Sequence, residues 1–171
     1  HLKNLHFKGG NSLRFFRYGN QYFNGDDSFQ WSGLDGGSIW MSDGNLVVDF
    51  CILESGDLGE VARHGGLIHA KGGSNIKIQN STLKETRASG DGGAMYVLGS
   101  YLEIRSSDFY SCSSGTGGTN FGGGLAAGSS SVDIASSTFS SNYAYLGGSA
   151  IFAFTTQMII NDTQFDSNIM G

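Results

Sequence analysis

Five times along this 171-residue chain, a double glycine is followed 16 to 18 residues later by a short apolar cluster that ends on Leu or Phe. The cluster has the form apolar-x-apolar-x4-Leu/Phe, and its final residues are 30, 26, 30 and 26 positions apart. A period of this length signals stacked structural repeats, because each repeat must bury its apolar face against its neighbours. The glycine pairs are Gly36–Gly37, Gly65–Gly66, Gly92–Gly93, Gly123–Gly124 and Gly147–Gly148, and the clusters are Leu46/Val48/Leu53, Ile76/Ile78/Leu83, Leu102/Ile104/Phe109, Val132/Ile134/Phe139 and Met158/Ile160/Phe165.

The alternation within each cluster is typical of a β-strand with one buried face. Ile76 and Ile78 are expected to face the interior, and Lys77 between them to face solvent. The polar stretch that follows, here Asn80-Ser81-Thr82, favours a tight corner because such side chains bond the local backbone. The equivalent outward positions are Val47, Lys77, Glu103, Asp133 and Ile159.

These features predict an all-β parallel β-helix, a solenoid in which each repeat is one coil of about three short strands. A helical solenoid would instead show apolar residues about every three to four positions along longer segments, and no segment does. We expect a single domain over residues 1–171 with about five to six coils, whose repeats start near residues 36, 65, 92, 123 and 147.

Two of the repeat motifs are similar to those of a known family. Gly92-Gly93-Ala94-Met95 followed by Phe109, and Phe139-x-x-Asn142 and Phe165-x-x-Asn168, resemble the GGA-[ILV] and FxxN repeats of chlamydial polymorphic outer-membrane proteins. The resemblance covers approximately residues 36–171. It implies a right-handed parallel β-helix displayed outside the cell and used for adhesion or as a structural stalk. Gly56, Thr86 and Cys112 stand at the Asn position in the other repeats.

The segment 1–35 follows the repeat pattern poorly. Gly9–Gly10 lies 27 residues before Gly36, which indicates one further coil, irregular and rich in aromatic residues. We expect these aromatics to cover the open end of the core, as solenoids require, with an interface for a neighbouring molecule as the alternative. The segment Ser113–Gly122 is expected to be a surface loop between coils. The aromatics concerned are Phe15, Phe16, Tyr18, Tyr22, Phe23, Phe29 and Trp31.

Charge and cysteine content exclude some functions. The chain has 10 basic and 15 acidic residues and no basic run, so no nucleic-acid partner is expected. Its apolar stretches are too short for membrane insertion. Cys51 and Cys112 lie two repeats apart, about 10 Å along a stack of strands, which is too far for a disulfide. We therefore expect two free, buried thiols.

An outward aromatic row is the main candidate binding surface. The position four residues after the first glycine of each pair is Trp40, His69, Tyr96 and Ala127, and one extra residue shifts the last equivalent to Phe152. Trp40, His69, Tyr96 and Phe152 would thus form a row broken at Ala127. Such rows bind sugar rings or another chain. The alternative is cross-strand packing without a ligand.

Two N-glycosylation sequons occur, Asn80-Ser81-Thr82 and Asn161-Asp162-Thr163. Alternation places Asn161 outward, because Met158 and Ile160 face inward. Asn80 is in phase with inward Ile78 and is expected to bond the backbone at a corner. Asn161 is therefore the preferred glycosylation site.

An enzyme is the less favoured interpretation. Asp26-Asp27 and Arg63-His64-Gly65 look like the paired Asp and His-Gly elements of polygalacturonases, but the Asn-x-Asp and Arg-x-Lys elements are missing. Fold alone does not establish chemistry, so no catalytic residue, metal or cofactor is assigned.

The sequence favours a secreted or cell-surface structural or adhesive protein, and a glycoprotein if the sequons are used. The expected roles are a filament or coat subunit, or a stalk segment, because the strand edges at the end of a β-helix invite another coil. The expected partners are further copies, stacked head to tail, or other surface proteins and glycans. A carbohydrate-binding or polysaccharide-cleaving module is the alternative.

Overall fold

The computed structural model describes residues 2–3, 6–8, 13–16, 39–54, 62–115 and 120–171, the first three ranges as backbone only. These residues form β-strands joined by short corners, and none of them is helical. No helix among them is long and apolar enough to cross a membrane. Gly36–Gly37, Gly56, Asp26-Asp27 and most of the 1–35 segment lie outside the described residues.

The strands form four parallel sheets, named I to IV in the order in which a coil visits them. Sheet I contains β3 (Leu13–Phe16), β4 (Ile39–Ser42), β7 (Ile68–Lys71), β11 (Met95–Leu98), β15 (Leu125–Gly128) and β19 (Ile151–Phe154). Sheet II contains β1 (Leu2–Lys3), β5 (Asn45–Asp49), β8 (Asn75–Gln79), β12 (Tyr101–Arg105), β16 (Ser131–Ala135) and β20 (Gln157–Asn161). Sheet III contains β2 (His6–Lys8), β6 (Ile52–Glu54), β9 (Thr82–Lys84), β13 (Asp108–Tyr110), β17 (Thr138–Ser140) and β21 (Gln164–Asp166). Sheet IV contains β10 (Arg87–Ala88), β14 (Ser113–Ser114), β18 (Tyr143–Ala144) and β22 (Ile169–Met170).

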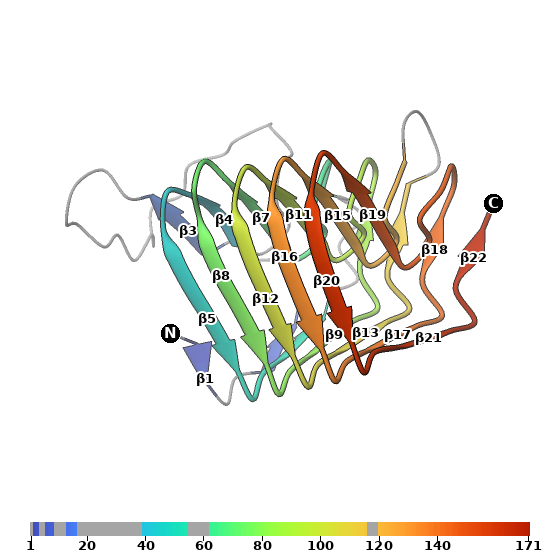
Figure 1. Cartoon of the computed structure of the whole chain (residues 1–171), viewed down its shortest axis with the longest axis horizontal. Helices are drawn as coiled ribbons and strands as arrows, with labels where there is room; N and C mark the ends of the chain where they lie inside the picture. Colours follow the sequence, from blue (N-terminus) through green and yellow to red (C-terminus); the bar gives the residue numbers. More distant parts are fainter. Residues whose placement is uncertain (1, 4–5, 9–12, 17–38, 55–61, 116–119) are drawn as a thin grey trace.

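The chain winds through sheets I, II, III and IV and begins the next coil one strand further along, which makes a parallel β-solenoid (Figure 1). The fold class predicted from the sequence is confirmed. About four turns carry all four strands, namely β7–β10, β11–β14, β15–β18 and β19–β22. This differs slightly from the expected five to six coils of about three strands. The two N-terminal sets, β1–β3 and β4–β6, have three strands each among the described residues.

The first strands follow a different path from the later coils. After β1 in sheet II and β2 in sheet III the chain enters sheet I as β3, and its next described strand, β4, pairs with β3 in that same sheet. In later coils a strand of sheet I is followed by one of sheet II. The N-terminal strands are therefore irregular, as the sequence indicated.

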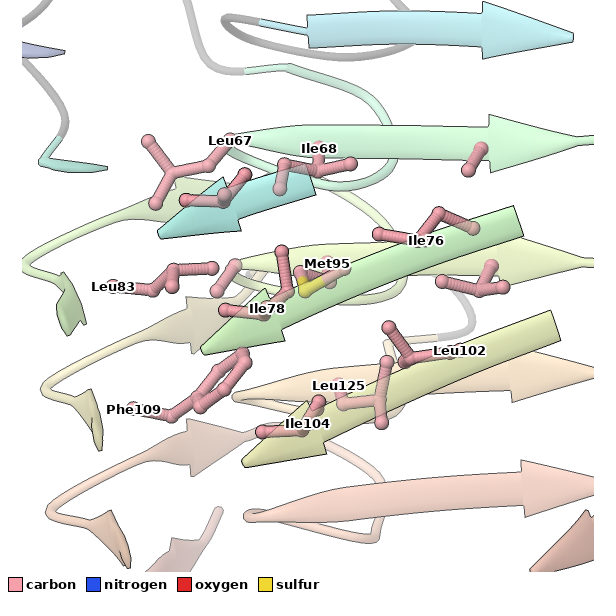
Figure 2. Close-up of a cluster of buried hydrophobic side chains, with 14 of the residues drawn as sticks. Leu67, Ile68, Ile76, Ile78, Leu83, Met95, Leu102, Ile104, Phe109 and Leu125 are labelled. Carbon is pink, nitrogen blue, oxygen red and sulfur yellow. The ribbon is translucent and has the colours of Figure 1, made fainter. Parts of the chain in front are cut away.

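Equivalent apolar residues stack directly above one another and form the core. Ile78, Ile104 and Ile134 are register partners and are fully buried. The predicted outward set is also confirmed, because Lys77, Glu103 and Asp133 lie in a second register line. Figure 2 shows Ile76, Ile78, Leu102 and Ile104 beside side chains from the other walls, such as Met95 and Phe109. The solenoid is thus filled by side chains from three walls.

Three of the four corners place non-glycine residues in the left-handed region, at a cost on the order of 1 kcal/mol per residue. Corner 1 joins sheets I and II, corner 2 joins II and III, corner 3 joins III and IV, and corner 4 leads back to sheet I. Ser106 at corner 2, for example, has φ of 47°. The other positive-φ residues of these three corners are Asp43, Gly72, Gly73, Gly99, Ser129 and Thr155 at corner 1, Phe50, Asn80, Ser136 and Asp162 at corner 2, and Glu85, Ser111, Ser141 and Ser167 at corner 3.

At several corners the residue after the left-handed position links neighbouring coils. Ser107 Oγ donates a hydrogen bond to Arg105 O in its own corner (2.7 Å) and accepts one from Ser81 N–H in the preceding coil (3.1 Å). The same two-way bonding recurs at corner 1, where Ser130 Oγ accepts from Ser100 N–H (3.2 Å). These corner ladders have one polarity, since in each of these bonds the N–H of one coil donates to the side chain of the next.

At corner 3 the ladder is built from the Asn residues of the FxxN motifs. Asn142 is fully buried, and its Oδ1 accepts from Cys112 N–H (3.0 Å) while its Nδ2 donates to Phe109 O (3.0 Å). Asn168 repeats both contacts one coil later, with Asn142 N–H (3.1 Å) and Phe139 O (2.8 Å). The motif Asn therefore serves coil stacking.

Corner 4 depends on glycine. Gly65, Gly92, Gly122 and Gly148 have φ between 61° and 71°, and each lies three residues before a strand of sheet I. A Cβ on Gly92 would overlap Met95 O, so a side chain is excluded by space as well as by backbone angle. In the fourth repeat, the glycine pair that forms corner 4 is therefore Gly122–Gly123. The predicted pair, Gly123–Gly124, lies one residue too far along the chain.

Replacing a central ladder residue should destabilise the fold far more than replacing an outward one. We expect Ile134→Ala, at a fully buried position, to lower the free energy of unfolding by about 2–5 kcal/mol. The matched control is Ile159→Ala, at an outward position that is 50% exposed, which should change it by about 0.5 kcal/mol or less. Urea unfolding followed by circular dichroism measures both. Equal effects would contradict the stacked core.

Candidate functional site

The predicted aromatic row exists as a register line on the outer face of sheet I. Trp40 pairs with His69, and His69 with Tyr96. The next members are Ala126 and Phe152, because Tyr96 pairs with Ala126 and Ala126 with Phe152. The expected interruption at Ala127 was wrong by one residue. Ala127 pairs with Val97 and is buried in the core, because Gly122 rather than Gly123 takes the left-handed corner.

The rings of the row pack on one another. His69 is 4% exposed and meets Tyr96 edge to face, with ring centroids 5.1 Å apart. The Lys71 ammonium lies 5.1 Å from the centroid of the Trp40 ring, within cation–π range. Beyond Ala126 the outer face carries a second group, in which Phe121 stacks on Phe152 at 4.2 Å. This tilted, mutually covered arrangement favours cross-strand packing over an open platform for sugar rings.

His64 joins the row from corner 4, a contact that sequence reasoning missed. Its ring centroid lies 4.9 Å from that of Tyr96, and its Nδ1 accepts a hydrogen bond from Asp91 N–H (3.2 Å). The Asp91 carboxylate is further away, at 3.8 Å, and its Oδ1 accepts from Phe121 N–H. Because Nδ1 accepts this backbone N–H, it does not donate to the Asp91 carboxylate, and the His64 ring makes a packing contact with the row. In the sequence, His64 was noted only as part of the Arg63-His64-Gly65 element, which did not indicate a contact with the aromatic row.

The outer face of sheet II carries a ladder of alternating charge. Lys77 Nζ lies 3.3 Å from Glu103, Glu103 lies 3.5 Å from Arg105 Nε, and the Arg105 guanidinium also bonds Asp133. Exposed pairs contribute roughly 0.2–1 kcal/mol each, so their main effect is on register, since a slip would place like charges together.

Both sequon asparagines are exposed. Asn161 lies at the end of β20 on the outward face, as predicted. Asn80 was expected in phase with the inward residues, and this was wrong. It adopts φ of 49° at corner 2, which breaks the alternation, and its Nδ2 donates to the Asp49 carboxylate (3.2 Å) and not to backbone.

Both cysteines are free and buried, as predicted. They occupy corner-ladder positions in different corners, where other coils have Ser, Thr or Asn. Cys51 N–H donates to Ser81 Oγ (3.1 Å), and Cys112 N–H donates to Asn142 Oδ1. Burial raises the pKa of the Cys112 thiol well above its ordinary value.

The C-terminal coil, β19–β22, exposes the inside of the solenoid. Ile160, Phe165 and Met170 occupy inward register positions, yet they are 40%, 47% and 62% exposed. Their partners in the preceding coil, Ile134, Phe139 and Ala144, are fully buried. The inward side chains of this last described coil are therefore exposed, whereas those of the preceding coil are covered by it. We call this exposed surface the C-terminal face.

Asn161 should be the modified sequon when the chain is secreted from a eukaryotic expression host. Its side chain is exposed and outward, whereas the Asn80 amide is engaged by Asp49. We expect Asn161→Gln to remove most of the glycan mass measured by intact-protein mass spectrometry, and Asn80→Gln to leave it. Glycan retained in Asn161→Gln would contradict this assignment.

The Cys112 thiol should be inert in the folded protein. The thiolate is the reactive form, and a raised pKa keeps the group protonated at neutral and mildly alkaline pH. In a Cys51→Ser background, a disulfide reagent at about pH 8 should label Cys112 only as fast as the protein unfolds, and fully in denaturant. Rapid labelling of native protein would show that this corner opens locally.

Comparison of the chain with protein-family models, with curated proteins and with solved structures finds no match in any of the three.

Proposed function

We propose that this chain is an extracellular structural or adhesive solenoid, a building block of a surface filament, a coat or a stalk. It is extended by end-on stacking of another β-solenoid coil on its C-terminal face. The observation that carries this proposal is the exposure of Ile160, Phe165 and Met170 at inward register positions.

The C-terminal face combines two kinds of unfilled contact. Its strands β19, β20, β21 and β22 each stand last in the order of their sheet and present an edge. Open edges of this kind pair with added strands. The apolar side chains between the edges add an exposed patch in the middle of the same surface. A stacked coil would cover both at once.

The first strands of a second copy fit this face by register. β1, β2 and β3 stand at the opposite end of the same three sheets from β20, β21 and β19. Phe7 is a register partner of Leu53, and Leu13 of Ile39, and both of these partners are buried core residues. Head-to-tail stacking would bring β2 of one copy into register with β21 of the next, with Phe7 paired with Phe165. Such contacts do not close and give filaments.

The extracellular placement draws on two sequence features. Both sequon asparagines lie at exposed corners or strand ends, where a glycan would not disturb coil stacking. The FxxN and GGA-[ILV] motifs, which resemble chlamydial polymorphic outer-membrane repeats, have clear stacking roles in this solenoid at Asn142, Asn168 and Gly92. These features support a surface-displayed stalk or coat.

Self-association should depend on the C-terminal face. We expect the wild type to form head-to-tail assemblies at high concentration, seen by sedimentation velocity and negative-stain electron microscopy. Phe165→Asp should weaken the association at least about tenfold, because a charge would be buried in the contact.

Phe50→Asp is the matched control, since Phe50 is 55% exposed at corner 2 of an internal coil. It should leave assembly unchanged. A wild type that stays monomeric, or equal losses in the two variants, would refute end-on stacking of copies.

A further inference from the structure

The C-terminal face has a polar pattern as well as an apolar one. Within the solenoid, the corner ladders run in one direction, from the N–H of each coil to the side chain of the next. The last steps are Ser130 N–H to Thr156 Oγ1 (3.4 Å) and Asn142 N–H to Asn168 Oδ1 (3.1 Å). Thr156 and Asn168 therefore supply the last acceptors of the ladders of corners 1 and 3. Their own N–H groups lie on the C-terminal face.

The same corners also supply carbonyl acceptors. Asn168 Nδ2 donates to Phe139 O in the coil beneath it (2.8 Å), and Thr156 Oγ1 lies 3.2 Å from Ala127 O. By the same register, the next coil would meet Phe165 O and Ala153 O. Each corner of the face thus offers one donor and one acceptor, spaced for a single Asn, Ser or Thr side chain.

We infer that the C-terminal face selects a coil that carries Ser or Thr at corner 1 and Asn at corner 3, one residue after each left-handed position. This inference rests on the proposed function and names its partner: a β-solenoid coil that continues both the apolar stack and the two corner ladders. Backbone edges give the affinity of strand addition, and side chains at fixed positions give its specificity. A partner without them leaves two N–H groups at the contact without acceptors.

A covalently added coil tests this selection in the 171-residue chain. A second copy of residues 146–171 is appended after Gly171, which keeps the repeat in phase because Gly171 N–H bonds Ala144 O. Hydrogen exchange of the resident Thr156 and Asn168 amides is then measured by NMR. We expect both to slow at least about tenfold relative to the unextended chain.

The decisive variant changes only the appended coil. In it, the copy of Thr156 is replaced by Val and the copy of Asn168 by Leu, while the resident Thr156 and Asn168 stay unchanged. Protection of the two resident amides should return to within about threefold of the unextended chain, while amides of β20 stay protected by the added strand. The control is Ser167→Ala in the appended copy, which removes an exposed corner hydroxyl outside the ladder and should keep full protection. Equal protection with and without the ladder side chains would overturn the inference, as would no protection at all.

This result is separable from self-association of the wild type. A monomeric wild type whose amides are protected by the intact extension refutes stacking of copies and keeps the selection of a ladder-bearing coil. A filament-forming wild type whose amides are protected equally by both extensions keeps end-on stacking and refutes the selection.

Discussion

The fold depends on the hydrogen bond between a corner side chain and the backbone N–H of the coil before it. Strand pairing alone leaves the corners of a solenoid with backbone groups that have no partner in a ladder, and buried groups of this kind cost about 1–3 kcal/mol each. Ser107, Ser130 and Asn142 solve this by bonding one coil while accepting from another. The left-handed residue just before each of them turns the chain so that the next side chain points inward. The left-handed backbone conformation and the hydrogen bond of the following residue therefore act together at each of these corners.

This combination explains why the chain tolerates such varied residues at its left-handed corners. Glu85, Ser111, Ser141 and Ser167 share one corner and nearly the same φ, between 50° and 53°. Their side chains are not needed there, because the following residue carries the bond. Corner 4 is different, since Gly92 meets Met95 O so closely that no side chain fits. Glycine is thus required at one corner in four, which is why the glycine pairs, and not the other corners, were the visible repeat signal.

Much of the fold could be predicted from the sequence, because the repeat period and the alternation of apolar residues determine which residues stack in register from coil to coil. Ile78, Ile104 and Ile134 were placed correctly for this reason. The fourth sheet was missed, because strands as short as Arg87–Ala88 are too brief to show alternation. Ala127 and Asn80 were misplaced because a left-handed residue shifts the phase, and a sequence does not show which of three consecutive glycines, or which polar corner residue, adopts it. Of the candidate site, the aromatic register line was predictable. The mutual covering of its rings and the approach of His64 were not, because both depend on side-chain packing across corner 4.

The extra length of the repeat between Phe109 and Phe139 has a local structural origin. From Met95 to Phe109 and from Leu125 to Phe139 the spacing is 14 residues, so the path through sheets I to III is constant there. The four extra residues of the longer repeat lie between β14 and β15, where 10 residues join the strands, against 6 between β18 and β19. One flank of the solenoid therefore absorbs changes in chain length without disturbing the stack. Peptides grafted into the connections between sheets IV and I of successive coils would be spaced by about one strand separation, so the solenoid could display several copies of a peptide at a fixed, short interval.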